Sequence, residues 1–189
     1  MVDTREQLLT AASRLLAEEG PEALTVRRIA AAAGVSTMGV YSRFGNKDGV
    51  VDALFREGFE GLHAAISAAP AVADPLTDLR GTCVAYRAFA RSHATHYRIM
   101  FEGAVPGFEP SEESRSVAKT AFEALVERVD RCLEAGILGG ATAEQIAASL
   151  WAATHGLVSL ELFGTTPDVL AGDDPYGRTM SALVRGFTV

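Results

Sequence analysis

Apolar side chains recur three and four positions apart along most of this 189-residue chain, which is the spacing of one face of an α-helix. The alternation of apolar and polar residues that would predict β-strands is not seen. Capping residues, glycines and prolines interrupt the helical pattern and divide it into roughly nine segments. The sequence therefore predicts an all-α protein of about nine helices.

Residues 25–47 contain two short predicted helices separated by a tight turn. Thr25 is a suitable N-cap for the first helix, because its hydroxyl can accept a hydrogen bond from an unpaired backbone N–H group. Gly34 ends this helix, since glycine adopts the left-handed conformation of a sharp turn without steric cost. Ser36 can then cap a second helix that begins at Thr37. This arrangement predicts a helix-turn-helix, whose second helix enters the DNA major groove.

Spacing within the second helix predicts which of its side chains face DNA. Val40 and Phe44 lie four positions apart and are the predicted inward pair. Lys47 lies at the start of the next helix, where its charge and the positive helix end together suit a phosphate. The predicted DNA-contacting residues of the segment are Thr25, Arg27, Arg28, Ser36, Thr37, Met38, Gly39, Tyr41, Ser42, Arg43 and Lys47.

Different members of this set have different predicted roles. Tyr41 and Lys47 would bind phosphate oxygens, which positions a protein on DNA without reading its sequence. Thr37, Met38 and Arg43 would carry the choice of bases, and only Arg43 can read a guanine through two hydrogen bonds. The alternative is that these residues form an ordinary solvated helix surface. The ordered combination of two caps, a glycine turn and a lysine at the next helix favours DNA binding.

Charge supports this interpretation through its distribution. The net charge of −7 argues against general affinity for nucleic acids. Residues 25–50, however, contain four basic side chains and a single acid, Asp48, so a basic footprint on an acidic body is predicted. The composition, with 48% hydrophobic and 22% charged residues, is ordinary for a globular protein.

No signal peptide and no membrane-spanning segment are predicted, which places the chain in the cytoplasm. The N-terminal residues include Asp3 and Glu6 and lack an apolar core. Cys83 and Cys132 have no cysteine near them in the sequence and are predicted to be small buried side chains.

The segment 25–47 resembles the DNA-binding domain of the tetracycline-repressor (TetR) family of bacterial transcriptional regulators, and the resemblance covers residues 4–60. The matching positions are Thr25, Ile29, Ala30, Ala33, Gly34, Val35, Ser36, Val40, Tyr41, Arg43, Phe44 and Lys47. The resemblance implies a ligand-responsive transcriptional regulator, most simply a repressor that a small-molecule effector releases from double-stranded operator DNA. One departure is Gly49, where the family usually has a helix former, and it predicts a looser start of the fourth helix.

A second resemblance lies in the segments 96–101 and 150–164. Both are similar to TetR regulators whose C-terminal domain is named for a Trp-His-Gly pattern. This resemblance implies that the last two helices pair with their copies in a homodimer. The apolar segment around 150–163 agrees, because it requires burial on more than one side. The predicted dimer-interface residues are Leu157, Leu160, Phe163, Met180, Leu183, Val184 and Phe187.

The same resemblance implies a small-molecule pocket among helices five to eight. Candidate lining residues are Tyr86, Phe89, His93, Tyr97, Met100, Phe101, Phe122, Trp151 and His155. The alternative for each aromatic residue is ordinary core packing. His93 and His96 lie on one helical face and could in principle hold a metal. No cysteine or carboxylate stands at ligand spacing beside them, so no metal or other cofactor is predicted.

Residues 1–48 are thus predicted to form the helix-turn-helix domain, and residues 49–189 a helical ligand-binding and dimerisation domain, linked by a fourth helix over about 46–68. An enzyme is the rival class, but the sequence contains no nucleophile motif, phosphate-binding loop or zinc-binding pair that would support it. A DNA-binding architectural protein without a ligand is the other alternative, and a solid core in the second half would favour it.

Overall fold

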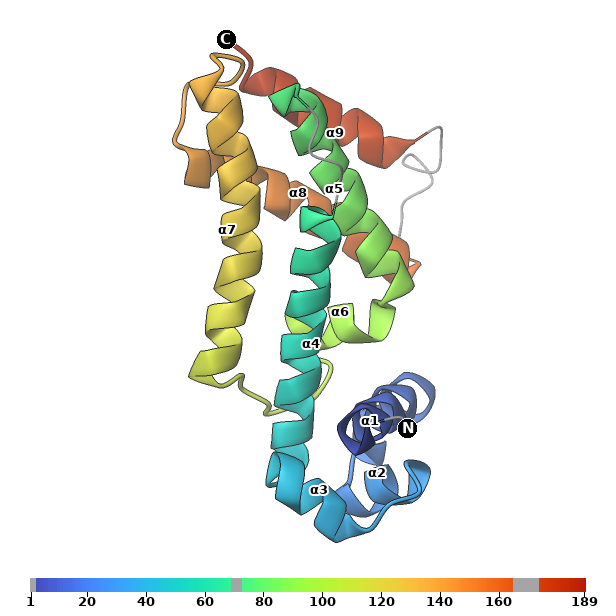
Figure 1. Ribbon diagram of the computed structural model, residues 1–189. Coiled ribbons are helices and arrows are strands. Elements are labelled where there is room, and N and C mark those ends of the chain that lie inside the picture. The colour runs from blue at the N-terminus through green and yellow to red at the C-terminus, as the bar shows by residue number, and fades with distance from the viewer. Residues whose placement is uncertain (1–2, 69–72, 165–173) are drawn as a thin grey trace. The chain divides into compact units, whose positions relative to one another are not determined.

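The computed structural model describes residues 3–68, 73–164 and 174–189, and nine α-helices lie within these ranges (Figure 1). The helices are α1 (Thr4–Glu19), α2 (Val26–Ala32), α3 (Thr37–Phe44), α4 (Lys47–Ser67), α5 (Pro75–Ser92), α6 (Ala94–Phe101), α7 (Glu112–Glu134), α8 (Ala143–Phe163) and α9 (Pro175–Gly186). A short 3-10 helix, Pro21–Ala23, follows α1. The predicted all-α fold is confirmed.

The chain divides into two compact units. Unit 1 contains Met1–Glu60 and His93–Ala118, and unit 2 contains Gly61–Ser92 and Lys119–Val189. The long helices α4 and α7 each contribute residues to both units. The predicted boundary after residue 48 does not coincide with this division, because α4 belongs to unit 1 as far as Glu60. As a boundary between functions it stays a prediction.

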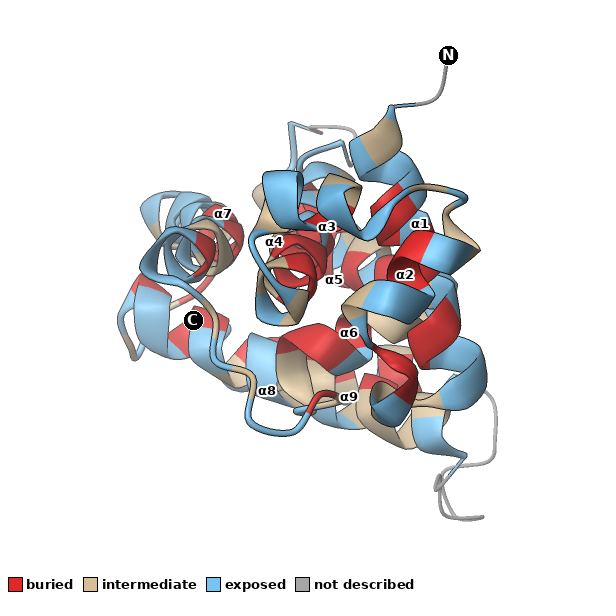
Figure 2. Cartoon of the chain, turned by 90° about the horizontal axis from the view of Figure 1, so that it is seen from below, coloured by how far each residue is buried: buried red, intermediate tan, exposed pale blue. Residues whose placement is uncertain are grey.

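The core of unit 1 is formed by apolar residues of α1 to α4 and α6. Helix α1 contacts α2, α3 and α6, and α2 contacts α3. The largest fully buried side chains of this core are Leu8, Leu24, Ile29, Val40, Val50, Val51, Leu54 and Tyr97. Figure 2 shows the buried residues of α1 and α4 alternating with exposed ones around each helix, as helical spacing predicts.

The core of unit 2 forms where α8 packs against α5 and α9. Its largest fully buried side chains are Leu79, Val129, Ile146 and Leu150. A charged group lies in the same unit: Asp78 on α5 is 2% exposed, and its Oδ2 lies 2.5 Å from a guanidinium nitrogen of Arg131 and 3.9 Å from one of Arg128. Arg128 also donates a hydrogen bond to the carbonyl oxygen of Ile66 at 3.0 Å. These contacts join α7 to α5 and to the end of α4 within the unit.

Helix α8 is long and apolar enough to cross a membrane by length and composition alone, although the sequence contains no unbroken run of 18 apolar residues and no membrane span was predicted. The prediction required an unbroken apolar run. An 18-residue window of mean hydropathy 1.3 instead tolerates polar side chains such as Thr154 and Ser159. A single helix of this kind is weak support for a membrane span, because core helices of soluble proteins meet the same criterion. Within unit 2, α8 also takes part in an ion pair between Glu161 and Arg87 at 2.8 Å.

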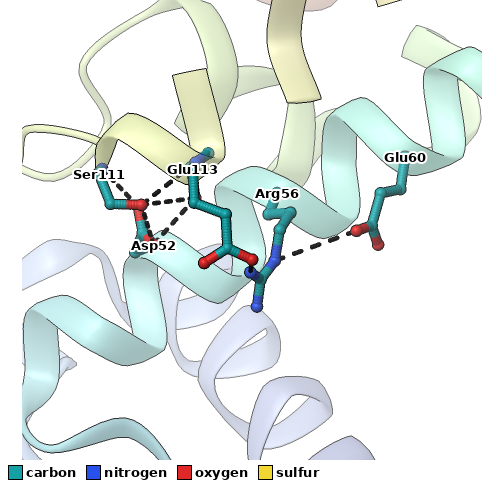
Figure 3. A network of polar contacts seen from close by, with 6 residues as sticks. Asp52, Arg56, Glu60, Ser111 and Glu113 are labelled. Atoms are coloured by element: carbon teal, nitrogen blue, oxygen red, sulfur yellow. Dashed lines mark hydrogen bonds and ion pairs between the residues drawn. The ribbon is translucent and has the colours of Figure 1, made fainter. Parts of the chain in front are cut away.

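Helix α4 is joined to the start of α7 by polar contacts within unit 1 (Figure 3). The carboxylate of Asp52 accepts hydrogen bonds from the backbone N–H of Ser111 at 2.8 Å and from the hydroxyls of Ser111 and Ser114, both at 2.9 Å. Arg56, one turn further along α4, pairs with Glu113 at 2.6 Å. We call these five residues the α4–α7 clasp.

Gly49 lies just after the tight connection between α3 and α4. A Cβ atom at this position would lie 1.9 Å from the carbonyl oxygen of Phe44, so a larger residue requires the backbone to move. The N–H of Gly49 donates a hydrogen bond to Oδ1 of Asn46 at 2.8 Å, which caps the start of α4. The predicted looser start of this helix is therefore wrong, because the glycine permits a close approach between two backbone segments.

Candidate nucleic-acid interface

The helix-turn-helix consists of α2, α3 and the turn between them (Figure 1). Thr25 caps α2 and Ser36 caps α3, each by accepting a backbone N–H hydrogen bond at 3.3 Å. Gly34 has a φ of 68°, the left-handed conformation that the turn was predicted to need. The N–H of Val35 bonds to the carbonyl oxygen of Ala30 at 3.0 Å, which closes the end of α2. The predicted motif is present.

One face of α3 is exposed and the other packs in unit 1. Val40 is fully buried, and Phe44 is half-buried with the guanidinium carbon of Arg5 5.8 Å from its ring centroid. The predicted inward pair is therefore confirmed. On the opposite face, Met38 is 69% exposed and Tyr41 is 52% exposed. An exposed thioether suits a thymine methyl group and an exposed phenol suits a phosphate oxygen.

Three predicted DNA-contacting residues line one shallow depression of unit 1. Thr25 precedes α2, Tyr41 lies on α3 and Lys47 is the first residue of α4. The depression has a volume of about 460 Å³, and Glu22 is its acidic member. A hydroxyl, a phenol and an ammonium group around one depression are donors of the kind that bind phosphate oxygens.

Other members of the predicted set make contacts within the chain. Arg28 pairs with Glu19 of α1 at 2.6 Å, and both side chains are 45% exposed. Arg43 donates a hydrogen bond to the carbonyl oxygen of Gly39 at 3.3 Å and so lies along its own helix. The remaining exposed members are Arg27, Ser36, Thr37 and Ser42. Arg28 and Arg43 would have to exchange partners on meeting DNA, which costs little at a solvated surface.

The connection between α6 and α7 supplies two residues that sequence reasoning missed. Val105 and Pro106 line the same depression as Lys47, although they are far from it in the sequence. The prolines and glycine of this connection predict a turn but not its neighbours. The contact between α6 and α1 brings the connection to this part of unit 1.

The nine predicted ligand-binding residues are divided between the two units. His93, Tyr97, Met100 and Phe101 belong to unit 1. The members in unit 2 are Tyr86, Phe89, Phe122, Trp151 and His155. Among these, the Trp151 ring lies 6.4 Å from that of Phe122 and is stacked on His155 at 5.8 Å. A single pocket formed by all nine stays a prediction.

The histidines considered as metal ligands contact each other and a carboxylate. The rings of His93 and His96 have centroids 6.3 Å apart, and Nε2 of His96 lies 3.4 Å from Glu57 on α4. The hydrogen bond from His96 is the main cause that lowers the pKa of Glu57. No group of three or more potential metal ligands is found among residues 3–68, 73–164 and 174–189.

The predicted dimer-interface residues differ in their exposure within one chain. Met180 and Val184 are only 6% and 4% exposed, and the sulfur of Met180 lies 3.5 Å from the hydroxyl of Thr154 on α8. These two side chains pack inside unit 2 and have little surface left for a second copy. The more accessible members are Leu157, Leu160, Phe163, Leu183 and Phe187. An interface through α9 would therefore rest on Leu183 and Phe187 and not on Met180 and Val184, and the predicted set as a whole stays a prediction.

Two family models match the sequence along most of its length. Residues 8–54 match the model described as bacterial regulatory proteins, tetR family. Residues 79–186 match the model described as tetracyclin repressor-like, C-terminal domain, and this match alone covers more than half of the chain. No curated protein matches the chain in sequence.

Several solved structures have the same fold. A protein of unknown function from Rhodococcus sp. RHA1 is 25% identical with a TM-score of 0.85, over 100% of this chain and 97% of that chain. The TetR family transcriptional regulator PfmR from Thermus thermophilus is 24% identical with a TM-score of 0.70, over 84% and 86% respectively. NalD, the secondary repressor of the MexAB-OprM multidrug efflux pump in Pseudomonas aeruginosa, is 24% identical with a TM-score of 0.68, over 98% and 95%.

Proposed function

We propose that this chain, which belongs to the tetR family of bacterial regulatory proteins, is a repressor that a small molecule releases from operator DNA. Its activity is that of a DNA-binding transcriptional regulator, and the family is not one of enzymes. Regulators of this family are typically ligand-responsive repressors, which supports the proposed direction of control. They are soluble cytoplasmic proteins, and the same location is proposed for this chain.

The depression that Tyr41 and Lys47 share is the observation that carries the proposed DNA contact. Tyr41 belongs both to the depression and to the exposed face of α3. A DNA phosphate bound between Tyr41 and Lys47 would therefore set α3 beside the duplex. In that position Thr37, Met38 and Arg43 reach the base edges.

Gly39 supports the same orientation of α3. A Cβ atom added at Gly39 would meet the side chain of Val35 at 3.6 Å, an ordinary van der Waals contact. Packing within the chain therefore does not require glycine at this position. Alanine would also fit, and it would stabilise the helix by about 1 kcal/mol relative to glycine. A close approach of this backbone to the duplex accounts for the glycine.

We expect Lys47→Ala to weaken binding to all DNA sequences alike, because a phosphate contact carries no base preference. The slope of log K against log salt concentration should fall by about 1, since one phosphate is no longer neutralised. Duplexes selected by repeated rounds of binding to the purified protein provide the labelled DNA for these titrations. Lys119→Ala is the matched control, since Lys119 pairs with Glu123 on α7 and lies outside the predicted contact set. An unchanged salt slope in Lys47→Ala would rule out the phosphate role.

We also propose that α8 and α9 pair with their copies in a homodimer. Only 28% of the most apolar window of α8 is buried within one chain. Ala152 and Gly156 are exposed on this helix, and a Cβ atom at Gly156 would meet nothing within 4 Å. Small residues let a second helix approach closely, and a partner would bury the apolar surface that one chain leaves in water.

Leu157→Asp and Leu183→Asp should each convert the dimer to monomers, because a charge would be buried without a partner at the interface. Operator binding should be lost in both, since two recognition helices must reach successive major grooves roughly 34 to 36 Å apart. Sedimentation velocity at micromolar concentration measures the first effect. Val84→Asp on α5 is the control, because Val84 is 64% exposed and outside the proposed interface. A monomeric wild-type chain would refute the proposal.

The effector site is proposed among α5 to α8, and the resemblance to the Trp-His-Gly type is part of this proposal. The ring contacts of Trp151 with Phe122 and with His155 support this site within unit 2. Burial lowers the pKa of His155, so its ring is neutral at neutral pH and suits an uncharged ligand. Coupling to DNA binding of the usual size, about 5- to 150-fold, must be reciprocal, so operator DNA weakens the effector by the same factor.

A further inference from the structure

A groove in unit 2 lies between α5 and α9 and contains none of the nine predicted ligand-binding residues. Its volume is about 370 Å³, which lies within the range of small-molecule sites. The larger apolar side chains that line it are Leu79, Cys83, Val84, Tyr176, Met180 and Val184. Val84 is 64% exposed, so the groove presents apolar surface to solvent.

The floor of the groove is held in place and carries no charge. The hydroxyl of Tyr176 donates a hydrogen bond to the carbonyl oxygen of Cys83 at 2.6 Å, which ties α9 to α5. Burial raises the pKa of Tyr176 and raises the pKa of the Cys83 thiol to about 12. Both groups therefore stay protonated at neutral pH, and an apolar ligand resting on this floor meets no charge.

Three arginines follow one edge of the groove. Arg80, Arg87 and Arg91 share a face of α5 with Val84, and the first and last lie about 16 Å apart along the helix axis. Arg87 is neutralised, because Glu161 accepts three hydrogen bonds of 2.8 to 3.1 Å from its guanidinium. Arg80 and Arg91 are exposed and make no ion pair with the residues that the structure describes.

Acidic groups offset part of this charge. The hydrogen bond from Thr77 is the main cause that lowers the pKa of Asp74, and the charge of Arg80 contributes to the same shift. Asp174 also lines the groove, and its carboxylate accepts a hydrogen bond from the backbone N–H of Gly177 at 3.0 Å, which caps α9. The lining thus carries three arginines against one carboxylate, and Glu161 pairs with Arg87, so a net positive charge remains at the edge of an apolar groove in a chain whose net charge is −7. A local reversal of charge of this kind favours an anionic partner.

From this geometry we propose that the α5–α9 groove binds an amphipathic monocarboxylate, of the class of medium-chain fatty acids. The alkyl chain lies over Val84 and Met180, and the carboxylate pairs with Arg80 or Arg91 at one end of the groove. Guanidinium groups bind carboxylates through two parallel hydrogen bonds, and the apolar floor contributes in proportion to the length of alkyl chain it covers. The site goes beyond the proposed effector site, with which it shares no residue.

Isothermal titration of the purified full chain with octanoate, decanoate and dodecanoate tests the proposal, at concentrations below those at which these acids form micelles. Each added methylene should tighten binding about fourfold as long as the groove covers it. Decanol has the chain of decanoate without the charge. It should bind at least about tenfold more weakly, because it lacks the charge-assisted hydrogen bonds to arginine.

Substitutions locate the site. Val84→Asp should abolish decanoate binding and leave the fold intact, because this side chain is already exposed. Either Arg80→Ala or Arg91→Ala should lower the affinity about tenfold and so identify the carboxylate end. Arg178→Ala is the matched control, since Arg178 is an exposed arginine of α9 outside the groove.

Equal affinities for decanol and decanoate would overturn the proposal, and so would an Arg178→Ala variant that loses as much decanoate affinity as the groove variants. A monomeric Val84→Asp variant would overturn it as well, because the groove would then be an interface between copies of the chain. The titrations contain no DNA. A Lys47→Ala variant that binds decanoate normally would support a site independent of DNA contact. Failure of fatty-acid binding therefore leaves the proposed DNA contact untouched.

Discussion

Asp78→Ala should lower the free energy of unfolding by about 3–5 kcal/mol, because it removes one partner of a buried ion pair. Asp78 is 2% exposed, and its negative charge balances the positive charges of Arg131 and Arg128. The side chains of these two arginines are 44% and 14% exposed. Without the carboxylate, Arg128 keeps its charge in a mostly buried position. Urea denaturation followed by circular dichroism measures the loss, at one fixed protein concentration so that any dimer contributes equally.

The matched control for this substitution is Asp130→Ala. Asp130 is an exposed acid of the same helix as Arg128 and Arg131, and its removal should change stability by less than about 0.5 kcal/mol. Asp78→Asn keeps the shape and one acceptor oxygen, so its cost should fall between the two. If Asp78→Ala unfolds at the same urea concentration as Asp130→Ala, the buried pair contributes nothing net to stability.

Gly49→Ala should destabilise the chain and weaken operator binding together. The added Cβ atom would lie 1.9 Å from the carbonyl oxygen of Phe44, so α3 and α4 must move apart to admit it. Forced overpacking of this kind costs about 1–3 kcal/mol. The displaced segments carry Tyr41 and Lys47, so the affinity for the selected duplexes should fall as well.

Gly81→Ala on α5 provides the comparison for this prediction. A Cβ atom at Gly81 would meet nothing within 4 Å, so alanine should stabilise the helix by about 0.5–1 kcal/mol. The two variants carry the same chemical change in helices and should differ in the sign of their effect on unfolding. A Gly49→Ala variant as stable as Gly81→Ala, with unchanged DNA affinity, would contradict the prediction. It would mean that the backbone at Phe44 moves away from residue 49 without a cost in free energy.

Local signals explain why the DNA-reading motif could be predicted from the sequence. Thr25 and Ser36 cap helices through hydrogen bonds to residues three positions away, and Gly34 adopts its positive φ as a property of the turn itself. The inward direction of Val40 follows from helical spacing. Each of these features depends only on residues within a few positions, which a sequence displays directly.

Contacts between distant segments could not be predicted in the same way. The sequence places Val105 far from Lys47 and gives no sign that both line one depression. Met180 lies on an apolar face of α9, but periodicity cannot tell whether such a face covers its own chain or a second copy. The sequence shows Gly49 only as a weak helix former. The reason for a glycine there is the carbonyl oxygen of Phe44, which belongs to the preceding helix and leaves no room for a side chain.

The α4–α7 clasp has a consequence for how the molecule changes shape. Its carboxylate accepts three hydrogen bonds, and hydrogen bonds to a charged group contribute about 1.5–3 kcal/mol each, but water can replace every one of these partners when the clasp opens. Helices α4 and α6 are joined differently: the rings of Phe59 and Phe101 lie 5.3 Å apart, and parting them would wet both. The clasp therefore holds the start of α7 at one position along α4, because both serines bond to the carboxylate of Asp52. Asp52→Asn would weaken this connection without weakening the apolar core.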